Sequence, residues 1–301
     1  YGPLQAAIVD TDCHHGDGTQ DIYWNDPNTL YISFHQDGRT LYPGTGFLDE
    51  FGGPGALGYN INIPLPPGTG DEGILYVLDN LVLPILDEYK ADLLINSAGQ
   101  DNHYTDPLTN MNFTARGYAE LNHRLSPDIA VLEGGYSIEG ALPYVNLGII
   151  LAMAGLDYSQ VREPDYDEKK LRQSPKITEY IKKLCENIYD RWRQREQIAR
   201  EMLKGKDYVI RQRRVYYDTD GIMEYQTQRF KVCKKCSGVN TIESNSDRGM
   251  PIFAVTIPSD ACPSCVDEGH KAFKNADVQK YFKIYLQDRP NDRYSARHLT
   301  Y

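Results

Sequence analysis

Eight residues near the start of the chain hold three carboxylates and two imidazoles. The run Asp10-Thr-Asp-Cys-His-His-Gly-Asp17 directly follows the apolar stretch Ala6–Val9. Packing alone does not select such groups, because a buried charge is costly unless it is paired. An Asp and a His two residues apart at the end of a strand can point the same way and hold one cation, as Asp12 and His14 would. The run therefore predicts a metal site.

Two further polar loops follow apolar stretches in the same way. Ser97-Ala-Gly-Gln-Asp101 follows Leu93–Asn96, and Glu133-Gly-Gly-Tyr136 follows Ile129–Leu132. Open α/β sheets bind their ligands at the carboxyl ends of the strands. We therefore expect these two loops to lie beside the first one.

Four of the six cysteines form two Cys-x-x-Cys pairs, Cys233 with Cys236 and Cys262 with Cys265. Two such pairs are the ligand set of a tetrahedral structural zinc site. The alternative, two redox motifs, lacks the strand–helix context that such motifs need. Because the chain also shows no signal peptide, metal is favoured over disulfides, and the expected location is the reducing cytoplasm.

Short apolar runs alternate with helical patterns over the first half of the chain, which predicts an α/β fold. The runs are rich in Ile, Leu and Val and mostly do not alternate with polar residues, as is typical of a parallel sheet covered on both faces. Gly73–Tyr89 and Thr114–Leu125 are expected to be helices. The expected strands are Ala6–Val9, Leu30–Phe34, Tyr59–Pro64, Leu93–Asn96 and Ile129–Leu132.

The second half predicts a long helix and a small β domain. Ser174-Pro175 is an N-terminal signal for a helix that Gly205 ends, with an apolar stripe for packing on the α/β core at Ile177, Ile181, Leu184 and Ile188. Beyond it, Asp218-Thr-Asp-Gly221 predicts a hairpin that leads into the first cysteine pair. The pattern is that of a small β zinc ribbon. The expected domains are residues 1–195 and a helical linker with the ribbon at 196–301.

Charge divides the chain in two. Residues 1–160 hold 4 Lys and Arg against 21 Asp and Glu, whereas the other 141 residues hold 28 against 21. An acidic half would attract cationic substrates, and a basic half could meet protein or nucleic acid, although both are also consistent with ordinary solubilising surfaces. No apolar stretch approaches the ~18 residues of a membrane span, and the mean hydropathy is −0.55.

Four motifs together resemble the histone deacetylase family, the zinc-dependent deacetylases that include acetylpolyamine amidohydrolases. They are VDTDCHHGDGTQ (9–20), LYPGTG (41–46), SAGQDNHYTDPL (97–108) and LEGGYS (132–137). They occur in the family's order, and the resemblance covers about residues 1–190. It implies an arginase/deacetylase-like parallel sheet and removal of acetyl groups from acetyl-lysine in protein or from acetylpolyamine.

The resemblance also implies roles for individual residues. Asp12, His14 and Asp101 would bind the catalytic Zn²⁺, and Tyr136 would stabilise the developing oxyanion. Asp10 and Asp17 match the carboxylates that orient the family's two catalytic histidines. The substrate channel would be formed by Tyr42 and Leu108 as walls, with Gly134 and Gly135 allowing close approach of the backbone. A K⁺ ion would be held by Asp10, Asp12, His14, Ser33 and Phe34.

One feature of the family's pattern is missing. The tandem His-His that serves as general base and acid lies upstream of the first motif, and we expect the natural protein to be longer than this chain, which alone is then inactive. Only five of about eight family strands are recognised. The alternatives are a non-catalytic deacetylase-like binding module and an amidohydrolase for small molecules. His35 is interpreted as a core histidine, and His103 as a residue that only lines the pocket.

Overall fold

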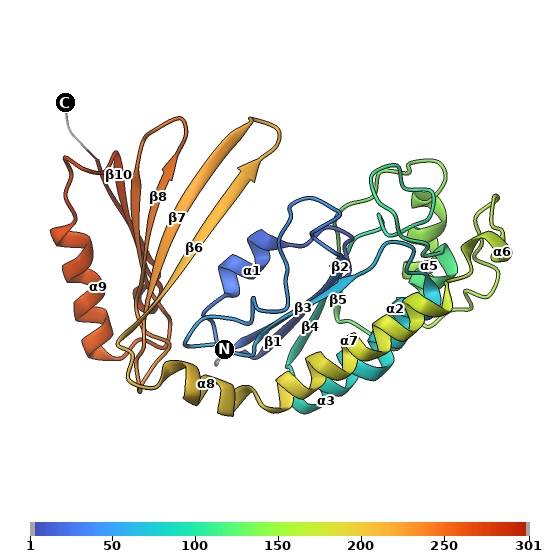
Figure 1. Cartoon of the computed structure of the whole chain (residues 1–301), viewed down its shortest axis with the longest axis horizontal. Helices are drawn as coiled ribbons and strands as arrows, with labels where there is room; N and C mark the ends of the chain where they lie inside the picture. The colour runs from blue at the N-terminus through green and yellow to red at the C-terminus, as the bar shows by residue number, and fades with distance from the viewer. Residues whose placement is uncertain (1–3, 299–301) are drawn as a thin grey trace. The chain divides into compact units, whose positions relative to one another are not determined.

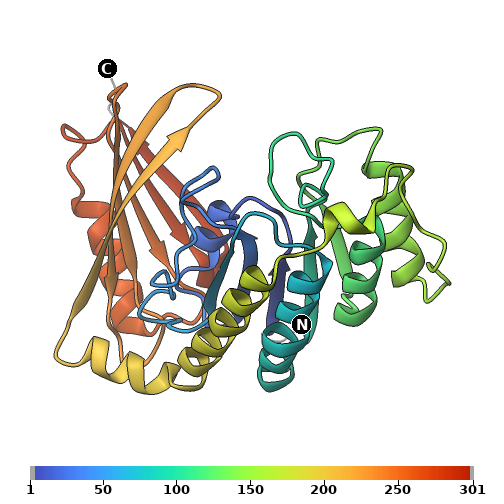
Figure 2. The same cartoon turned by 45° about the vertical axis from the view of Figure 1, so that its right-hand side comes forward.

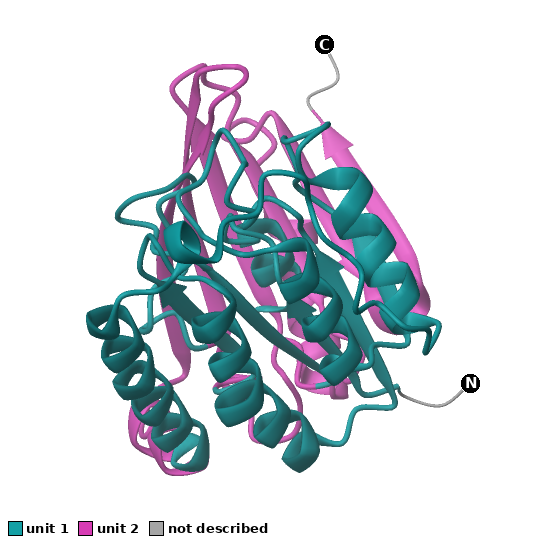
Figure 3. Ribbon diagram, turned by 90° about the vertical axis from the view of Figure 1, so that its right-hand side faces the viewer, with its two compact units in different colours: residues 1–24, 28–51, 58–195 teal, residues 25–27, 52–57, 196–301 magenta. Residues whose placement is uncertain are grey.

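The computed structural model describes residues 4–298, which form two compact units (Figure 3). Unit 1 holds the described residues up to Trp24, then Asn28–Phe51 and Gly58–Arg195. Unit 2 holds Asn25–Pro27, Gly52–Leu57 and the described residues from Glu196 onward.

Unit 1 is built on a five-stranded parallel sheet in the order β3-β2-β1-β4-β5 (Figure 1). All five runs that the sequence predicts as strands are strands, and helices flank the sheet, so the predicted α/β class is confirmed. Ile, Leu and Val fill β1 to β3 because the sheet is buried there. The strands are β1 (Ala6–Asp10), β2 (Thr29–Gln36), β3 (Asn60–Leu65), β4 (Leu93–Ala98) and β5 (Ile129–Leu132).

The last strand differs from the covered strand that the sequence predicts. In β5, Ile129 is 44% exposed and Leu132 73% exposed. Within residues 4–298, β4 is the one strand that pairs with β5, so its other edge is open. Its apolar side chains consequently have no second neighbour to bury them.

Two predicted helical segments are helical and end at the predicted residues, Tyr89 and Leu125, but they begin at Asp71 and Ala115 rather than at Gly73 and Thr114. Asp71–Val77 (α2), the π-helical turn Leu78–Val82 (η1) and Leu83–Tyr89 (α3) follow one another without a break. Ala115–Leu125 (α4) is capped by Thr114, whose side chain accepts a hydrogen bond from the Gly117 N–H. The other helices of this unit are α1 (Asp17–Tyr23), α5 (Leu142–Met153) and α6 (Glu168–Leu171).

The long C-terminal helix of unit 1 is shorter than predicted. Pro175–Arg193 (α7) starts at the Ser174 cap and buries Ile181, Leu184 and Ile188 on the core, as the stripe predicts. In Figure 2, α7 lies beside α2 and α3 in front of the strands. The helix ends at Arg193, and Arg195–Leu203 (α8) follows as a separate helix. Residues 188–200 contain neither Gly nor Pro, so the sequence did not predict the break at Gln194.

Unit 2 contains a six-stranded sheet in the order β11-β10-β9-β8-β7-β6. The hairpin of β6 (Tyr208–Tyr217) and β7 (Ile222–Lys231) confirms the predicted one. The unit is larger than the ribbon that the sequence predicts, because further strands and a helix join the cysteine-bearing segments. These are β8 (Asn240–Ser246), β9 (Ile252–Ile257), β10 (Lys283–Asp288), β11 (Arg293–His298) and α9 (Pro263–Asn275).

Among the described helices, none has both the length and the apolar character that crossing a membrane requires. This finding agrees with the mean hydropathy of the sequence.

His35 is a core histidine, as its position in the sequence predicts. Its Nδ1 lies 2.8 Å from Ser33 Oγ, its Nε2 donates to the Gly46 carbonyl at 3.0 Å, and the side chain is fully buried. Burial, followed by repulsion from His15, lowers the pKa of His35 to about 3. His35 is therefore neutral in the folded protein at pH values where the unfolded chain, with an ordinary histidine pKa of about 6.5, binds a proton.

We expect His35 to destabilise unit 1 in acid. The pKa of His35 is lower in the folded than in the unfolded chain. Its contribution to the free energy of unfolding is therefore complete above about pH 6.5 and is lost as pH falls toward 3. Between these values one proton adds a slope of about 1.4 kcal/mol per pH unit to the free energy of unfolding, and His35→Gln removes it. Urea unfolding followed by tryptophan fluorescence measures this slope, since both tryptophans, Trp24 and Trp192, lie in unit 1. Equal slopes for the two proteins would contradict the prediction.

Candidate metal centre

The strand order of unit 1 brings three loops together. Since β1, β4 and β5 are neighbours and run parallel, their carboxyl ends meet at one edge of the sheet. Asp12 and His14 follow β1, and Asp101 follows β4. One ligand atom from each of the three side chains lies within 4.8 Å of the others. His14 Nδ1 is 2.7 Å from Asp101 Oδ2 and 3.3 Å from Asp12 Oδ1.

Backbone amides orient both carboxylates. The Cys13 N–H donates to Asp101 Oδ1 at 2.8 Å, and the Gly134 N–H donates to Asp12 Oδ2 at 2.7 Å. A Cβ at Gly134 would lie 2.5 Å from Asp101 Oδ2, and one at Gly99 would overlap Asp12. Glycine is therefore required at both positions, because any side chain would displace a carboxylate.

The charges of the three groups are strongly coupled. Burial opposes a charged His14, but hydrogen bonds and charge attraction from Asp101 and Asp12 outweigh it and raise its pKa to about 10. Burial raises the pKa of Asp101 to about 6, although the His14 hydrogen bond opposes the shift. For Asp12, burial is outweighed by the hydrogen bonds from His14, and the pKa is lowered. Two buried carboxylates are thus stable in the charged form only when a positive charge lies between them.

The donor set fits a zinc ion. Carboxylate oxygens and an imidazole nitrogen are zinc ligands, and catalytic zinc sites use three protein ligands while keeping a further position for water or substrate. A divalent cation would take the place of the His14 proton and neutralise both carboxylates. Asp12 and Asp101 are buried, and His14 is partly exposed, so the centre is reached from one side.

Tyr136 lies beside the centre. Its ring is edge-on to that of His14, with centroids 6.1 Å apart, and the side chain is 46% exposed. The two channel walls expected from the sequence, Tyr42 and Leu108, are also largely exposed, at 46% and 54%. Gly134 and Gly135 precede Tyr136 in the same loop.

Asp106 ties these loops together and is absent from the sequence-predicted site. Its Oδ2 accepts a hydrogen bond from the Tyr136 N–H at 2.9 Å, and its Oδ1 accepts one from the Leu108 N–H at 3.0 Å. The signal was present in the run Thr105-Asp-Pro-Leu108, because an Asp before Pro favours a turn that its carboxylate can close.

The residues expected to hold K⁺ are close in space. Asp10 and Ser33 face each other in the register of β1 and β2, and Phe34 follows Ser33. Asp10 is buried, accepts a hydrogen bond from the Tyr31 hydroxyl at 2.6 Å, and has a pKa that burial raises to about 8. Asp17, the other expected orienting carboxylate, is the first residue of α1.

His103 does not line the pocket, in contrast to the sequence-based interpretation. It is fully buried, and its Nε2 lies 3.4 Å from Glu163 Oε1.

The four paired cysteines of unit 2 converge. Cys233 and Cys236 follow β7, Cys262 caps α9 and Cys265 lies in its first turn, and their sulfur atoms all lie within 4.8 Å of one another. The Cys233–Cys262 sulfur distance is 3.8 Å, which matches the ~3.8 Å edge of a tetrahedron with Zn–S bonds of about 2.3 Å. All four thiols are free.

The second pair does lie between a strand and a helix, β9 and α9, contrary to the sequence analysis. That context was invisible in the sequence because α9 starts within the cysteine pair itself. It does not favour a redox motif here, because both pairs share one cluster.

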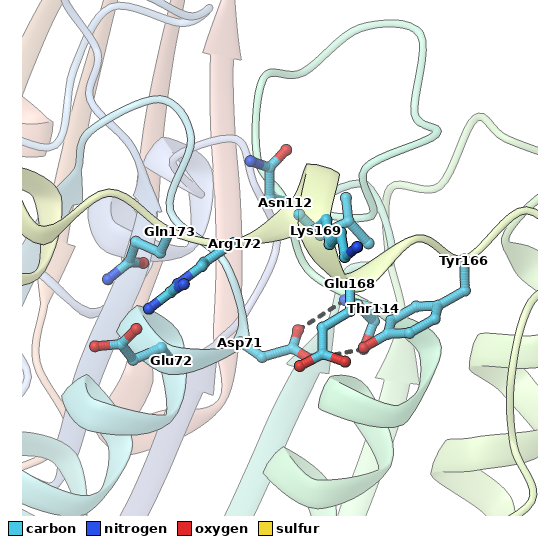
Figure 4. Close-up of a pocket in the computed structure, with 10 residues that line it drawn as sticks. Asp71, Glu72, Asn112, Thr114, Tyr166, Glu168, Lys169, Arg172 and Gln173 are labelled. Atoms are coloured by element: carbon cyan, nitrogen blue, oxygen red, sulfur yellow. Dashed lines mark hydrogen bonds between the residues drawn. The ribbon is translucent and has the colours of Figure 1, made fainter.

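A separate cavity of about 670 Å³ opens at the start of α2, away from the metal centre (Figure 4). Asp71 there accepts hydrogen bonds from the Thr114 N–H and hydroxyl at 2.8 and 2.7 Å. Gln173 accepts one from the Gly70 N–H. Asp71 and Gln173 thus already have hydrogen-bond partners within the protein. No residue that lines this cavity was predicted as a site residue.

Fold and site define an α/β protein with a candidate carboxylate–imidazole metal centre at the carboxyl edge of a parallel sheet. A family model described as "Histone deacetylase domain" matches residues 2–146. This part of the chain belongs to the histone deacetylase family.

Known proteins support this membership. A "Probable deacetylase" of Archaeoglobus fulgidus is 55% identical over 168 residues, which cover 53% of this chain and 46% of that protein. The "Acetoin utilization protein AcuC" of Bacillus subtilis is 36% identical over 176 residues, covering 56% and 46%. The crystal structure of the HDA15 HD domain matches with a TM-score of 0.54 and 29% identity, over 68% of this chain and 55% of that one. The chain thus spans about half the length of the relatives it matches.

Proposed function

We propose that this chain carries the metal-binding part of a zinc-dependent deacetylase that removes acetyl groups from N-acetylated amines. The convergence of Asp12, His14 and Asp101 within 4.8 Å, in a segment that belongs to the deacetylase family, is the observation that carries the proposal. Bound zinc would polarise an acyl carbonyl and lower the pKa of water.

The residues around the centre have distinct parts in this proposal. Asp12, His14 and Asp101 hold the metal, and the amides of Cys13 and Gly134 keep the two carboxylates in place. The Tyr136 hydroxyl donates a hydrogen bond to the oxygen that gains negative charge in the transition state. Tyr42 and Leu108 border the path of the acyl chain. A K⁺ ion at Asp10, Asp12, His14, Ser33 and Phe34 would neutralise the carboxylate of Asp10.

The proposed substrates are acetylated and cationic, either acetyl-lysine in protein or an acetylated polyamine. The excess of 21 Asp and Glu over 4 Lys and Arg in residues 1–160 supports a cationic substrate. Side-by-side hydrolysis of an acetyl-lysine peptide and N-acetylspermidine by the natural gene product tests the proposal. Failure to hydrolyse either substrate, with zinc bound at the centre, would favour the non-catalytic binding module.

We expect Tyr136→Phe to lower kcat about a hundredfold to a thousandfold, the usual effect of removing one oxyanion donor. KM and zinc content are expected to stay as in the parent, since the phenol hydroxyl is not a ligand. Steady-state kinetics with the better of the two substrates measures the effect. A matched Tyr180→Phe change on α7, which lies outside the site, should leave kcat unaltered.

We further propose that residues 196–301 are an extension distinct from the deacetylase part at 1–195, with a structural zinc at Cys233, Cys236, Cys262 and Cys265. The 3.8 Å distance between the Cys233 and Cys262 sulfur atoms, and the clustering of all four sulfurs within 4.8 Å, support this site. The positive balance of residues 161–301 supports a protein or nucleic-acid partner for the extension. Reduced thiolate ligands fit a cytoplasmic location, which completes the proposal.

A further inference from the structure

A buried histidine–glutamate pair, His103 and Glu163, has no part in the proposed chemistry. Glu163 is 2% exposed and comes from the segment between α5 and α6, and His103 is fully buried. Glu163 Oε1 lies 3.4 Å from His103 Nε2. A buried carboxylate is costly unless a polar neighbour compensates it, and His103 is such a neighbour.

The surroundings of His103 define which ring nitrogen carries the proton. The Thr105 N–H donates to His103 Nδ1 at 3.2 Å, so Nδ1 is the acceptor. An acceptor nitrogen carries no proton, so the ring proton lies on Nε2, which faces Glu163. Glu163 thus favours the same tautomer from the opposite side of the ring.

A chain of hydroxyl groups continues from His103. Thr105 Oγ1 lies 2.9 Å from His103 Nδ1, and Ser137 Oγ lies 2.7 Å from Thr105 Oγ1. Because Nδ1 accepts, the Thr105 hydroxyl donates to it, and the Ser137 hydroxyl then donates to Thr105. Gly140 leaves the space for this contact, since a Cβ there would lie 2.8 Å from Ser137 Oγ.

The chain ends beside Tyr136. Ser137 is its next residue, and the Tyr136 N–H is held by Asp106, whose own N–H donates to the His103 carbonyl at 2.8 Å. The Tyr136 side chain is 46% exposed, so packing restrains it only partly. Asp101 has independent anchors, because its carboxylate accepts from the Cys13 N–H and its carbonyl from the Thr109 hydroxyl.

We propose that Glu163 is a positioning residue for Tyr136. It holds His103 in the Nε2–H tautomer, and His103 then orders Thr105, Ser137 and the loop that carries Tyr136. This inference rests on the proposed function. It predicts an effect on the reaction of the bound substrate and none on the affinity for zinc.

Three variants test the proposal. Glu163→Leu removes the acceptor, and Thr105→Val breaks the chain at its middle with little change in volume. Both are expected to lower kcat about tenfold to a hundredfold, the range for partners that orient site groups, with unchanged KM and unchanged zinc Kd. Glu163→Gln retains an acceptor oxygen, so its kcat should stay close to that of the parent and above that of Glu163→Leu. Glu168→Leu, an exposed position at the start of α6, is the matched control.

Two measurements need no turnover. In ¹⁵N NMR spectra of the chain, His103 should carry its proton on Nε2, and Glu163→Leu should populate the Nδ1–H form. Amide hydrogen exchange should become faster in residues 133–140 of that variant. Unchanged tautomer and exchange in Glu163→Leu would overturn the proposal, as would a zinc affinity that falls in parallel with kcat. A parent protein without hydrolysis would refute the proposed function instead, while these two readouts still decide the role of Glu163.

Discussion

Asp101→Asn is expected to abolish metal binding at the carboxylate–imidazole centre. The substitution keeps the shape of the side chain and an acceptor for the Cys13 N–H, but it removes one of two negative charges that face His14. With one ligand lost, zinc content should fall from two ions per chain to one, and hydrolysis by the natural gene product should fall at least about a thousandfold, corresponding to roughly 4 kcal/mol of transition-state stabilisation.

The matched control for this change is Asp157→Asn, which alters an exposed carboxylate on the loop after α5. It should retain two zinc ions and full activity. Elemental analysis and a competition titration with a zinc indicator measure both proteins. Two zinc ions per chain in Asp101→Asn, with undiminished turnover, would refute the assignment of Asp101 as a ligand.

The second large effect is expected in unit 2. Its buried apolar cluster comprises just Val239, Val255, Ile257, Cys265 and Leu286 among the described residues, and one of these is itself a cysteine of the cluster. Structural zinc contributes an apparent ~10–16 kcal/mol of binding free energy in small domains, which is folding free energy when the site forms only on folding. Cys262→Ser, or zinc removal by a chelator, should therefore unfold this unit.

The two units can be followed separately. Both tryptophans belong to unit 1, so their fluorescence should stay native while far-ultraviolet circular dichroism loses strand signal and proteolysis cuts after residue 196. Cys185→Ala, a buried cysteine of α7 outside the cluster, controls for loss of a thiol and should retain both zinc ions. A metal-free protein with native strand signal, or an intact mass showing two disulfides, would contradict the structural zinc site.

Much of the local structure could be predicted from the sequence. Each of the five apolar runs of unit 1 is a strand, because Ile, Leu and Val in short unbroken runs suit a sheet buried on both faces. The Asp-Thr-Asp-Gly turn predicted the β6–β7 hairpin, and Ser174 predicted the start of α7. Unit 2 was underestimated, since β8 and β11 are polar, largely unburied strands and β10 alternates buried apolar with polar residues, so that their pairing depends on distant partners.

The candidate site was recognised in the same way but could not be assembled. The types and spacing of Asp12, His14 and Asp101 pointed to a cation, whereas their meeting depends on β1 and β4 being neighbours in the sheet. Asp106 was missed although the Asp-Pro turn signal was present in the sequence. Glu163 was missed because a single carboxylate outside the dense motif carries no local signal of a partner. His103 was misplaced because the direction of a side chain in a loop is decided by the loop's turns.

The sequence by itself thus determined what is local: the strands of unit 1, the helix caps, the cysteine pairs and the chemical nature of the metal ligands. These follow from periodicity, propensity and spacing within a few residues. Only the tertiary structure decided which groups meet across long separations, such as His14 with Asp101, 87 residues apart, and His103 with Glu163. Such contacts depend on the order of the strands in the sheet and on the pairing of buried charges. Both are set by the whole chain, and no short segment contains that information.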